Sequence, residues 1–376
     1  MTRLVFVVNN PDFLVSHRLV LVRGARAAGY DVHAITPDGS GVGDLERLGV
    51  EVHRWRLDRK GQGPATEASS VAALVWHYAR LQPDIAHHVT IKPVLYGSAA
   101  ARVVRRTAVV NAVSGFGYVF LAQGPLAALR RRAIAAAYRM ALSTPRSVVV
   151  LQNDDDEADL RRFGALDRAD VVKIRGSGVD LTRFRVAPEP EGPPVVMLPA
   201  RLLRDKGVVE FVDAARAVRA NRPGVRFVLA GGLDPGNPAA VTLEEVERWR
   251  SEGVVEWWGH QRDMAAAFGQ ATLVCLPSYR EGMPKALLEA AAVGRALLTT
   301  DAPGCRDAVD GGRAGVLFPV KDSAALARAI IRLVDDPQER QRLAKEARRL
   351  AEERFDEQAV LRAHLNLYER LRSASR

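Results

Sequence analysis

Two cations and two carboxylates in the second half of the chain have a spacing that could hold an anionic sugar derivative. Arg201 and Lys206 lie on one predicted loop, and Glu281 and Glu289 lie in the segment EGMPKALLE. If helical geometry held throughout, the two carboxylates would be about 12 Å apart, too far to share one proton or one metal ion. They could instead accept hydrogen bonds from hydroxyl groups at the two ends of an elongated ligand. The spacing alone is more typical of solvated surface charge, so the interpretation depends on the surrounding elements.

The carboxylate segment is predicted to follow a buried strand and to begin a helix. Residues 271–278 (ATLVCLPS) are apolar and few, as in a buried strand of a parallel sheet. Pro284 falls where a helix would begin, and residues 285–293 are strong helix formers that stop at Gly294. The open N–H groups and positive dipole end of such a helix can bind phosphate. Together with the two cations, they favour a nucleotide-diphosphate sugar as ligand; a solvated loop carrying Arg201 and Lys206 is the alternative.

The rest of the chain alternates predicted strands and helices, which indicates an α/β fold with doubly wound parallel sheets. At 376 residues the chain is long enough for two domains. A proline- and glycine-rich break at 187–194 (APEPEGPP) is the clearest linker. We therefore predict one domain over residues 1–186 and a second over residues 187–356.

In such sheets, ligands bind beyond the carboxyl ends of the strands. Three loops of the first half, at 9–17, 87–93 and 111–120, follow predicted strands and carry polar or glycine residues. A helix is predicted to begin only at His17. The candidate acceptor-binding residues on these loops are Asp12, His17, His88, Lys92, Ser114, Gly115 and Gly117. For the segment SGFGY, a flexible turn without a ligand is the alternative.

Basic residues are unevenly distributed in this chain of net charge +10. Residues 85–153 contain no Asp or Glu, and residues 126–142 are predicted to form a helix with an apolar face and the cluster Arg130, Arg131 and Arg132. Such asymmetry indicates an anionic partner, which could be a phospholipid, a diphosphate or nucleic acid, and for the helix we expect contact with a membrane surface. A surface helix of an arginine-rich protein would look similar.

Composition argues against several other classes of protein. No apolar run approaches the length of a membrane span, and the apolar part of MTRLVFVVNN is too short for a signal peptide. Two cysteines, Cys275 and Cys305, argue against a disulfide framework or a cysteine metal site. No G-x-G-x-x-G follows the first strand, which disfavours NAD chemistry, and no nucleic-acid-binding motif is present. We expect a cytoplasmic protein with no nucleic acid partner.

Four segments between residues 176 and 319 resemble the family 4 glycosyltransferases, which have the GT-B fold of two Rossmann-like domains facing across a cleft. They are GSGVD (176–180), ARLLRDKG (200–207), PSYREGMPKALLEA (277–290) and APGCRDAVDGGRAGVLFP (302–319). The terminal helix 357–376 fits the helix that crosses back onto the first domain in this family. NNPDFLVSHR, HHVTIKPVLYG and NAVSGFGYVF in the first half resemble a bacterial branch acting on polyprenyl-diphosphate-linked saccharides for surface polysaccharide or protein glycosylation.

The resemblance implies a role for each matching residue. Arg201 and Lys206 would hold the donor diphosphate and stabilise it as leaving group, Glu281 would contact the transferred sugar, and Glu289 would bind the ribose. Arg201, Lys206 and Glu281 are the expected catalytic residues. The other expected donor-binding residues are Gly178, Gly259, His260, Gly282, Met283 and Pro284.

The implied reaction retains the anomeric configuration and needs no metal or other cofactor, because cations and helix N–H groups supply the charge stabilisation. We therefore expect transfer of a sugar, with an N-acetylhexosamine as candidate, from a UDP-sugar to a lipid-diphosphate-linked acceptor at the cytoplasmic face of the inner membrane.

The chain departs from the family pattern at two places. Asn9 and Asn10 stand where many members carry paired glycines, and Ser114 stands where many carry a histidine. A histidine that positions the acceptor is therefore unsupported at that site. His17, His87 or His88 could substitute, with His17 as our candidate; a structural hydrogen-bonding role is the alternative for each of them. The alternatives to the transferase are a sugar-nucleotide 2-epimerase of the same fold and a non-enzymatic basic protein that binds a membrane or nucleic acid.

Overall fold

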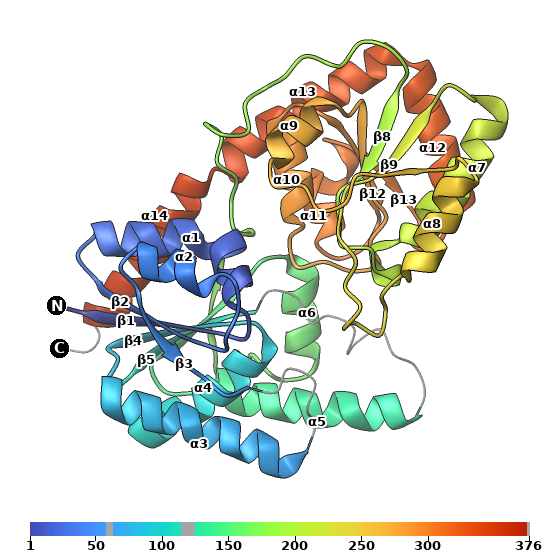
Figure 1. Cartoon of the computed structure of the whole chain (residues 1–376). Coiled ribbons are helices and arrows are strands. Elements are labelled where there is room, and N and C mark those ends of the chain that lie inside the picture. The colour runs from blue at the N-terminus through green and yellow to red at the C-terminus, as the bar shows by residue number, and fades with distance from the viewer. Residues whose placement is uncertain (58–62, 114–124, 374–376) are drawn as a thin grey trace. The chain divides into compact units, whose positions relative to one another are not determined.

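The computed structural model describes residues 1–57, 63–113 and 125–373. The chain divides into two compact units (Figure 1), each with its own parallel sheet. The first unit comprises Met1–Ser177 and Gln358–Arg376, and the second comprises Gly178–Glu357. In the described part, no helix is long and apolar enough to cross a bilayer. The α/β fold class with two doubly wound sheets is confirmed.

The first unit is built on a seven-stranded parallel sheet of order β3-β2-β1-β4-β5-β6-β7. Because β1 pairs with both β2 and β4, the strand order reverses at β1, the position where such sheets bind ligands. The strands are β1 (Arg3–Val8), β2 (Asp31–Thr36), β3 (Glu51–Arg54), β4 (Ile85–Val89), β5 (Ala108–Ala112), β6 (Ser147–Leu151) and β7 (Asp170–Lys173).

Helices cover both faces of this sheet, so its central strands are apolar throughout. Successive residues of β1 face opposite cores: Leu4 and Phe6 pack toward α1 and α14, and Val5 packs with α3. Figure 1 shows α1 and α2 on one face and α3, α4 and α5 on the other. The helices are α1 (Pro11–Ala27), α2 (Val42–Arg47), α3 (Pro64–Leu81), α4 (Ile91–Val104), α5 (Pro125–Leu142), α6 (Asp154–Arg162) and α14 (Glu357–Ser373).

Helix α1 begins six residues earlier than predicted, so most of the expected loop 9–16 is helical. Asn10 is its N-cap, with the side-chain oxygen accepting from Asp12 N at 3.0 Å, and Pro11 is the first helical residue. An N-cap Asn followed by Pro at the first position is a strong helix start signal, and it overrides the polar composition of the segment.

The second unit is built on a six-stranded parallel sheet of order β10-β9-β8-β11-β12-β13. Its strands are β8 (Val195–Leu198), β9 (Arg226–Leu229), β10 (Glu256–Trp257), β11 (Leu273–Leu276), β12 (Ala296–Thr300) and β13 (Val316–Phe318). One core joins the sheet to α7 (Val208–Asn221), α8 (Leu243–Ser251) and α12 (Ser323–Asp335). The other core joins it to α9 (Met264–Gly269), α10 (Lys285–Ala292), α11 (Cys305–Ala308) and α13 (Pro337–Arg354). Two 3₁₀ turns complete the unit, Arg204–Lys206 and Asp310–Gly312.

The structure places the boundary between the units at Ser177 and Gly178, before the predicted linker. The segment 187–194 packs on the second unit, because Arg295 Nη2 donates to the carbonyls of Ala187 and Pro188 at 3.0 and 2.8 Å. Glu189 also forms an ion pair with Arg340 at 2.5 Å. A proline-rich composition marks irregular backbone, but here buried arginines hold that backbone in place. Helix α14 lies almost wholly within the first unit.

Candidate functional site

The loop between β8 and α7 carries both predicted cations, and glycines bring it against the ends of β9 and β11. A Cβ at Gly231 would lie 1.7 Å from the carbonyl oxygen of Ala200, so only glycine allows this approach. Gly207 has φ +73°, and a Cβ there would lie 2.1 Å from the carbonyl oxygen of Pro277. The loop residues 200–207 are therefore fixed at the carboxyl ends of the central strands, where α/β sheets bind ligands.

Arg201 lies on the exposed side of this loop and pairs with a carboxylate. Its Nη1 is 2.6 Å from Asp234 Oδ2, and 59% of its side chain is exposed. Arg204, on the same loop, pairs instead with Glu245 at 2.6 Å. Asp234 was not predicted from the sequence, because it follows β9 on a loop that carries no recognisable motif. A guanidinium has five N–H donors, so the pair with Asp234 leaves Arg201 able to bind an anion.

Lys206 and Glu281, predicted to contact different parts of one ligand, form an ion pair with each other. Both side chains are largely buried, with 19% and 15% exposed. The turn that holds Glu281 is fixed by its N–H, which donates to the carbonyl of Pro303 at 3.0 Å. A Cβ at Gly304 would lie 2.4 Å from the carbonyl oxygen of Glu281, so this turn also depends on a glycine. The structure thus brings the predicted cation and carboxylate together across 75 residues of sequence.

The strand–turn–helix prediction for this segment is confirmed. Strand β11 ends at Leu276, and α10 begins at Lys285 with Pro284 as its N-cap. The carbonyl of Pro284 accepts from Leu287 N at 2.9 Å, which starts the helix. Gly282 and Met283 form the turn between Glu281 and the helix, and Met283 is buried. The N-terminus of α10 carries the positive end of the helix dipole.

Glu289 lies one turn into α10 and is buried, with 8% of its surface exposed. Its Oε1 is 3.2 Å from Nζ of Lys285, four residues earlier on the same helix. Burial raises the pKa of Glu289, and the charges of Lys285 and Arg183 oppose that rise. A buried carboxylate needs hydrogen-bond donors, which sugar hydroxyls could supply. Neither Lys285 nor Arg183 was predicted to contact Glu289. The i, i+4 spacing of Lys285 and Glu289 could have indicated the contact with Lys285.

Tyr279 links the cation loop to the carboxylate turn. Its N–H donates to the carbonyl of Asp205 at 2.9 Å, and its hydroxyl donates to Glu210 Oε1 at 2.5 Å. Burial and the contact with Glu210 raise the pKa of Tyr279, so the hydroxyl remains a proton donor. Lys321 Nζ lies 4.9 Å from the centre of the same ring. No sequence pattern predicted this role for Tyr279.

Three other predicted donor residues occupy different positions in the second unit. Gly178 has φ +73°, and a Cβ there would lie 2.4 Å from Cα of Glu357, so its glycine is explained by packing against the start of α14. Gly259 has φ +67° and follows β10 in an open position. His260 is exposed and lies next to Gly232, at the end of β9. The placement of Gly259 and His260 at strand ends agrees with the loop that was predicted to carry them.

Two predicted acceptor residues lie at the start of α1. Asp12 accepts from Ser40 Oγ and from Gly41 N, both at 2.6 Å, so it holds the loop after β2. His17 is half-buried, stacks on Phe13 with ring centroids 4.2 Å apart, and its Nδ1 is 2.8 Å from Ser16 Oγ. Asp12 therefore has a structural role, whereas His17 stays a candidate for contact with the acceptor.

The placement of His88 does not favour the predicted acceptor role. Strand β4 places it inside the core, fully buried, with Nε2 2.6 Å from the hydroxyl of Tyr78 and Nδ1 2.8 Å from Asn111 Oδ1. Gly97 leaves the space that this ring fills. Lys92, on α4, pairs with Glu67 at 3.0 Å. Ser114, Gly115 and Gly117 lie outside the described residues.

Several arginines of the acidic-free stretch 85–153 bind backbone rather than facing a partner. Arg102 Nη2 donates to the carbonyl of Met140 at 2.5 Å, and Arg139 Nη2 donates to the carbonyl of Phe163 at 2.7 Å. Arg146 Nη1 donates to the carbonyl of Arg106 at 2.9 Å. Arg132 is exposed on α5, whereas the side chains of Arg130 and Arg131 lie outside the described set. Part of the charge asymmetry is therefore structural.

Two cysteines and one group of possible metal ligands are separate from the set of predicted donor residues. Cys275 and Cys305 are both free and buried. Within the described residues, one set of three possible metal ligands was found, His33, Glu51 and His53, and it belongs to the first unit. A surface hollow of about 630 Å³ is lined by residues of α8, β10 and their surroundings, and none of the predicted donor residues lines it.

Family models match both halves of the chain. Residues 3–150 match the model for "Glycosyl transferase 4-like" proteins, and residues 181–350 match that for "Glycosyl transferases group 1". The chain is 26% identical over 367 residues to the N,N'-diacetylbacillosaminyl-diphospho-undecaprenol alpha-1,3-N-acetylgalactosaminyltransferase of Campylobacter jejuni, covering 94% of this chain and 95% of that protein. It is 31% identical over 204 residues to a glycogen synthase of Mycobacterium tuberculosis, covering 53% of this chain and 48% of that protein.

Solved structures share the whole architecture. Sucrose-phosphate synthase from Thermosynechococcus elongatus superposes with a TM-score of 0.80 at 20% identity, covering 100% of both chains. Anabaena HepE in complex with UDP and glucose gives a TM-score of 0.80 at 19% identity, covering 98% of this chain and 100% of that one. At such identities the likeness concerns the fold alone. With two parallel-sheet units and family models matched over most of its length, the chain belongs to the group 1 glycosyl transferases with a 4-like N-terminal half, and is a glycosyltransferase of the GT-B fold.

Proposed function

We propose that this glycosyltransferase moves a sugar from a UDP-sugar to a polyprenyl-diphosphate-linked saccharide with retention of anomeric configuration. The observation that carries the proposal is the cluster in the second unit, where Lys206 pairs with Glu281 and Lys285 pairs with Glu289 around the N-terminus of α10. Cations and carboxylates alternate there, as a ligand with both phosphates and hydroxyl groups requires.

The donor diphosphate is assigned to Arg201, Lys206 and the N-terminus of α10. An ammonium has three N–H donors, so Lys206 can keep its contact with Glu281 and still donate to a phosphate oxygen. Arg201 is exposed and has donors beyond the one that contacts Asp234. The buried carboxylate of Glu289 is assigned to the ribose hydroxyls, and Glu281 to the transferred sugar.

The acceptor class is supported by the relative from Campylobacter jejuni, whose name describes an N-acetylgalactosaminyl transfer to a diphospho-undecaprenol saccharide. The match covers nearly the whole of both chains, including the first unit, to which the acceptor is assigned. The same name describes an alpha linkage, which an α-linked donor gives by retention. An N-acetylhexosamine is therefore our candidate for the transferred sugar. The comparisons give no support to a 2-epimerase.

In the proposed reaction, an acceptor hydroxyl attacks the anomeric carbon from the face that carries the diphosphate. The new glycosidic C–O bond forms, the bond from that carbon to the phosphate oxygen breaks, and the hydroxyl proton passes to a phosphate oxygen of the departing UDP. Arg201, Lys206 and the helix N–H groups stabilise the charge that develops on the leaving group. This stabilisation is why we propose that no metal ion is needed.

The test is incubation of the purified chain with a panel of UDP-sugars and a polyprenyl-diphosphate-linked saccharide. We expect UDP release and a longer glycolipid with one donor, an α anomeric proton in the product, and unchanged initial rates with EDTA. Absence of product and of UDP release across the panel would contradict the proposal. A β product would contradict retention alone, and a requirement for added Mg²⁺ or Mn²⁺ would contradict metal independence alone. Acceptor-independent conversion of UDP-N-acetylglucosamine would indicate an epimerase.

We also propose that the enzyme acts at the cytoplasmic face of the inner membrane. Its basic first unit would bind the membrane surface peripherally. A lipid-linked acceptor requires such contact, and exposed arginines such as Arg105, Arg106 and Arg132 could bind anionic headgroups. On sedimentation with vesicles containing about 30% phosphatidylglycerol, the protein should be found in the pellet at low salt and in the supernatant at high salt. Equal recovery in the supernatant with neutral and anionic vesicles would contradict this proposal.

A further inference from the structure

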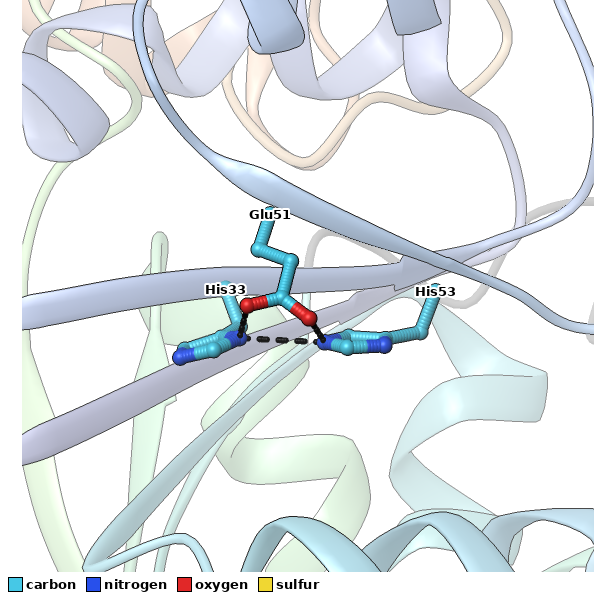
Figure 2. A group of neighbouring side chains, drawn as sticks. All are labelled: His33, Glu51 and His53. Atoms are coloured by element: carbon cyan, nitrogen blue, oxygen red, sulfur yellow. Dashed lines mark hydrogen bonds and ion pairs between the residues drawn. The ribbon is translucent and has the colours of Figure 1, made fainter.

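Two histidines and a glutamate converge at the edge of the sheet in the first unit. Strand β3 is the edge strand and pairs in parallel with β2, with His33 opposite Glu51 and Ile35 opposite His53. Glu51 and His53 are two residues apart on one strand, so both side chains point to the same face, and His33 points to that face from β2. Figure 2 shows the three side chains turned toward one another.

The separations between their ligand atoms match those around a small metal ion. His33 Nδ1 is 3.0 Å from His53 Nε2, and the Glu51 oxygens are 3.6 Å from His33 Nδ1 and 3.7 Å from His53 Nε2. Two ligands at about 2.05 Å from a tetrahedral ion are about 3.3 Å apart. The three observed distances lie on either side of that value, so shifts of a few tenths of an ångström would form one face of a tetrahedron.

A second carboxylate lies beside the ring of His33. Nε2 of His33 is 3.0 Å from Asp31 Oδ2, outside hydrogen-bond geometry, and Asp31 Oδ2 also accepts from Arg3 Nε at 2.9 Å. The negative charge of Asp31 favours a proton on Nε2 of His33, which leaves the lone pair of Nδ1 for an ion. Metal-binding histidines commonly have a carboxylate near the opposite ring nitrogen.

The charges around the three side chains also suit a cation. Asp31 and Glu51 supply two negative charges, against the positive charges of Arg3 and Arg80 nearby. The plain alternative is a hydrogen bond from His53 Nε2–H to His33 Nδ1 with no ion.

We propose that His33, His53 and Glu51 bind one borderline divalent cation, with Zn²⁺ as the first candidate. Two imidazole nitrogens and one carboxylate oxygen suit Zn²⁺, whereas Mg²⁺ and Ca²⁺ prefer oxygen ligands alone. The ion takes the place of the proton between the two rings, and that proton moves to Nδ1 of His53. The site joins edge strand β3 to β2 and has one coordination position left for water. It is separate from the donor site assigned to the second unit.

The experiment titrates the chelator-treated, dialysed full chain with ZnCl₂ by calorimetry and follows thermal unfolding in parallel. We expect one Zn²⁺ per chain, a rise in Tm, and visible absorption of tetrahedral Co²⁺ when CoCl₂ replaces zinc. His53→Gln and Glu51→Gln should each weaken zinc binding about tenfold or more. Both side chains are partly or largely exposed, so these variants should fold, which circular dichroism checks.

The matched control is Glu46→Gln, which removes an exposed carboxylate of α2 and should leave zinc affinity unchanged. Anomalous diffraction at the zinc edge should give a peak about 2.0–2.2 Å from the three ligand atoms. The proposal is overturned if no binding is seen at millimolar zinc. It is equally overturned if both variants bind zinc like the unmodified chain, because the ion would then lie elsewhere.

Discussion

At the scale of single residues, the candidate donor site is a set of paired charges. Lys206 contacts Glu281, Lys285 contacts Glu289 and Arg201 contacts Asp234. In each pair the carboxylate orients the cation but occupies only some of its N–H donors. Binding of a diphosphate would add a second anion to each cation, and hydroxyl groups would occupy the carboxylates. Preorganised charges of this kind stabilise a leaving group without the cost of reorganising solvent.

Replacing Lys206 with Ala should lower kcat/KM for sugar transfer about 100- to 1000-fold, the usual cost of removing one donor that stabilises developing charge. The loss of kcat/KM should be larger than a change in Tm can explain, because the role proposed for Lys206 is chemical. Arg204→Ala is the control: it removes a cation of the same loop that pairs with Glu245, and should change kcat/KM less than about threefold. Full activity of Lys206→Ala would contradict the assignment of the diphosphate.

Glu289→Gln keeps the shape of the side chain but removes its charge, so hydrogen bonds from ribose hydroxyls should weaken. UDP contains the ribose and is the probe: calorimetry should show a loss of affinity of about 10- to 150-fold at pH 7.5. Because burial raises the pKa of Glu289, affinity of the unmodified chain should also fall in mildly acidic buffer as this carboxylate is protonated. Glu244→Gln, an exposed position on α8, should bind UDP normally. Equal affinity in Glu289→Gln would remove Glu289 from the donor site.

At the scale of elements, regular segments were predictable from sequence and contacts between segments were not. The helices predicted over 285–293 and 126–142 match α10 and α5 to within one residue at each end, because the helix-forming residues and the end signals agree there. The start of α1 was missed because loop-like residues outweighed the Asn10–Pro11 cap signal. The pair Lys206–Glu281 joins two loops 75 residues apart, and no local pattern encodes such a contact.

Gly207 gives a test of the element that carries Lys206. Gly207→Ala places a Cβ in a left-handed conformation and against the carbonyl of Pro277, so the free energy of unfolding should fall by about 3 kcal/mol. Gly253→Ala is the matched control, since Gly253 has φ +67° with nothing within 4 Å of the added Cβ. It should cost about 1 kcal/mol, the left-handed strain alone. Urea unfolding measures both, and equal losses would show that the loop moves to admit the new methyl group.

At the scale of the whole molecule, segments from both ends of the chain build the first unit. Helix α14 packs its Tyr368 against β4, with the hydroxyl 2.6 Å from His87 Nδ1. Arg18 of α1 is buried in the same region, where its Nη1 is 3.3 Å from the carbonyl of Gly176 and burial lowers its pKa to about 10. His364 of α14 stacks on His87 with centroids 5.6 Å apart. The terminal helix thus closes this core with polar rings as well as leucines.

These buried rings should make the chain sensitive to acid. Burial lowers the pKa of His364 to about 3, aided by Arg18, and lowers that of His88 to about 4; burial also keeps the pKa of His87 well below its ordinary value. The unfolded chain takes up these protons below about pH 6.5 and the folded chain does not. Stability is therefore greatest above pH 6.5 and falls as the pH decreases toward 3 to 4, by about 2 kcal/mol per histidine at pH 5.

Substitution of His364 measures the contribution of one of these histidines to the pH dependence of stability. It tests whether the ring of His364 stays neutral in the folded chain. His364→Leu should flatten the decline of the unfolding free energy between pH 6 and pH 5 by about 1.4 kcal/mol per pH unit, the value of one proton. Urea unfolding at pH 7.5, 6.0 and 5.0 measures this slope, which a change in packing alone would not alter. The exposed His260, replaced by Gln, should leave the slope unchanged. A slope that is the same in His364→Leu and the unmodified chain would mean that His364 takes up a proton in the folded state, and that α14 leaves its ring accessible to water.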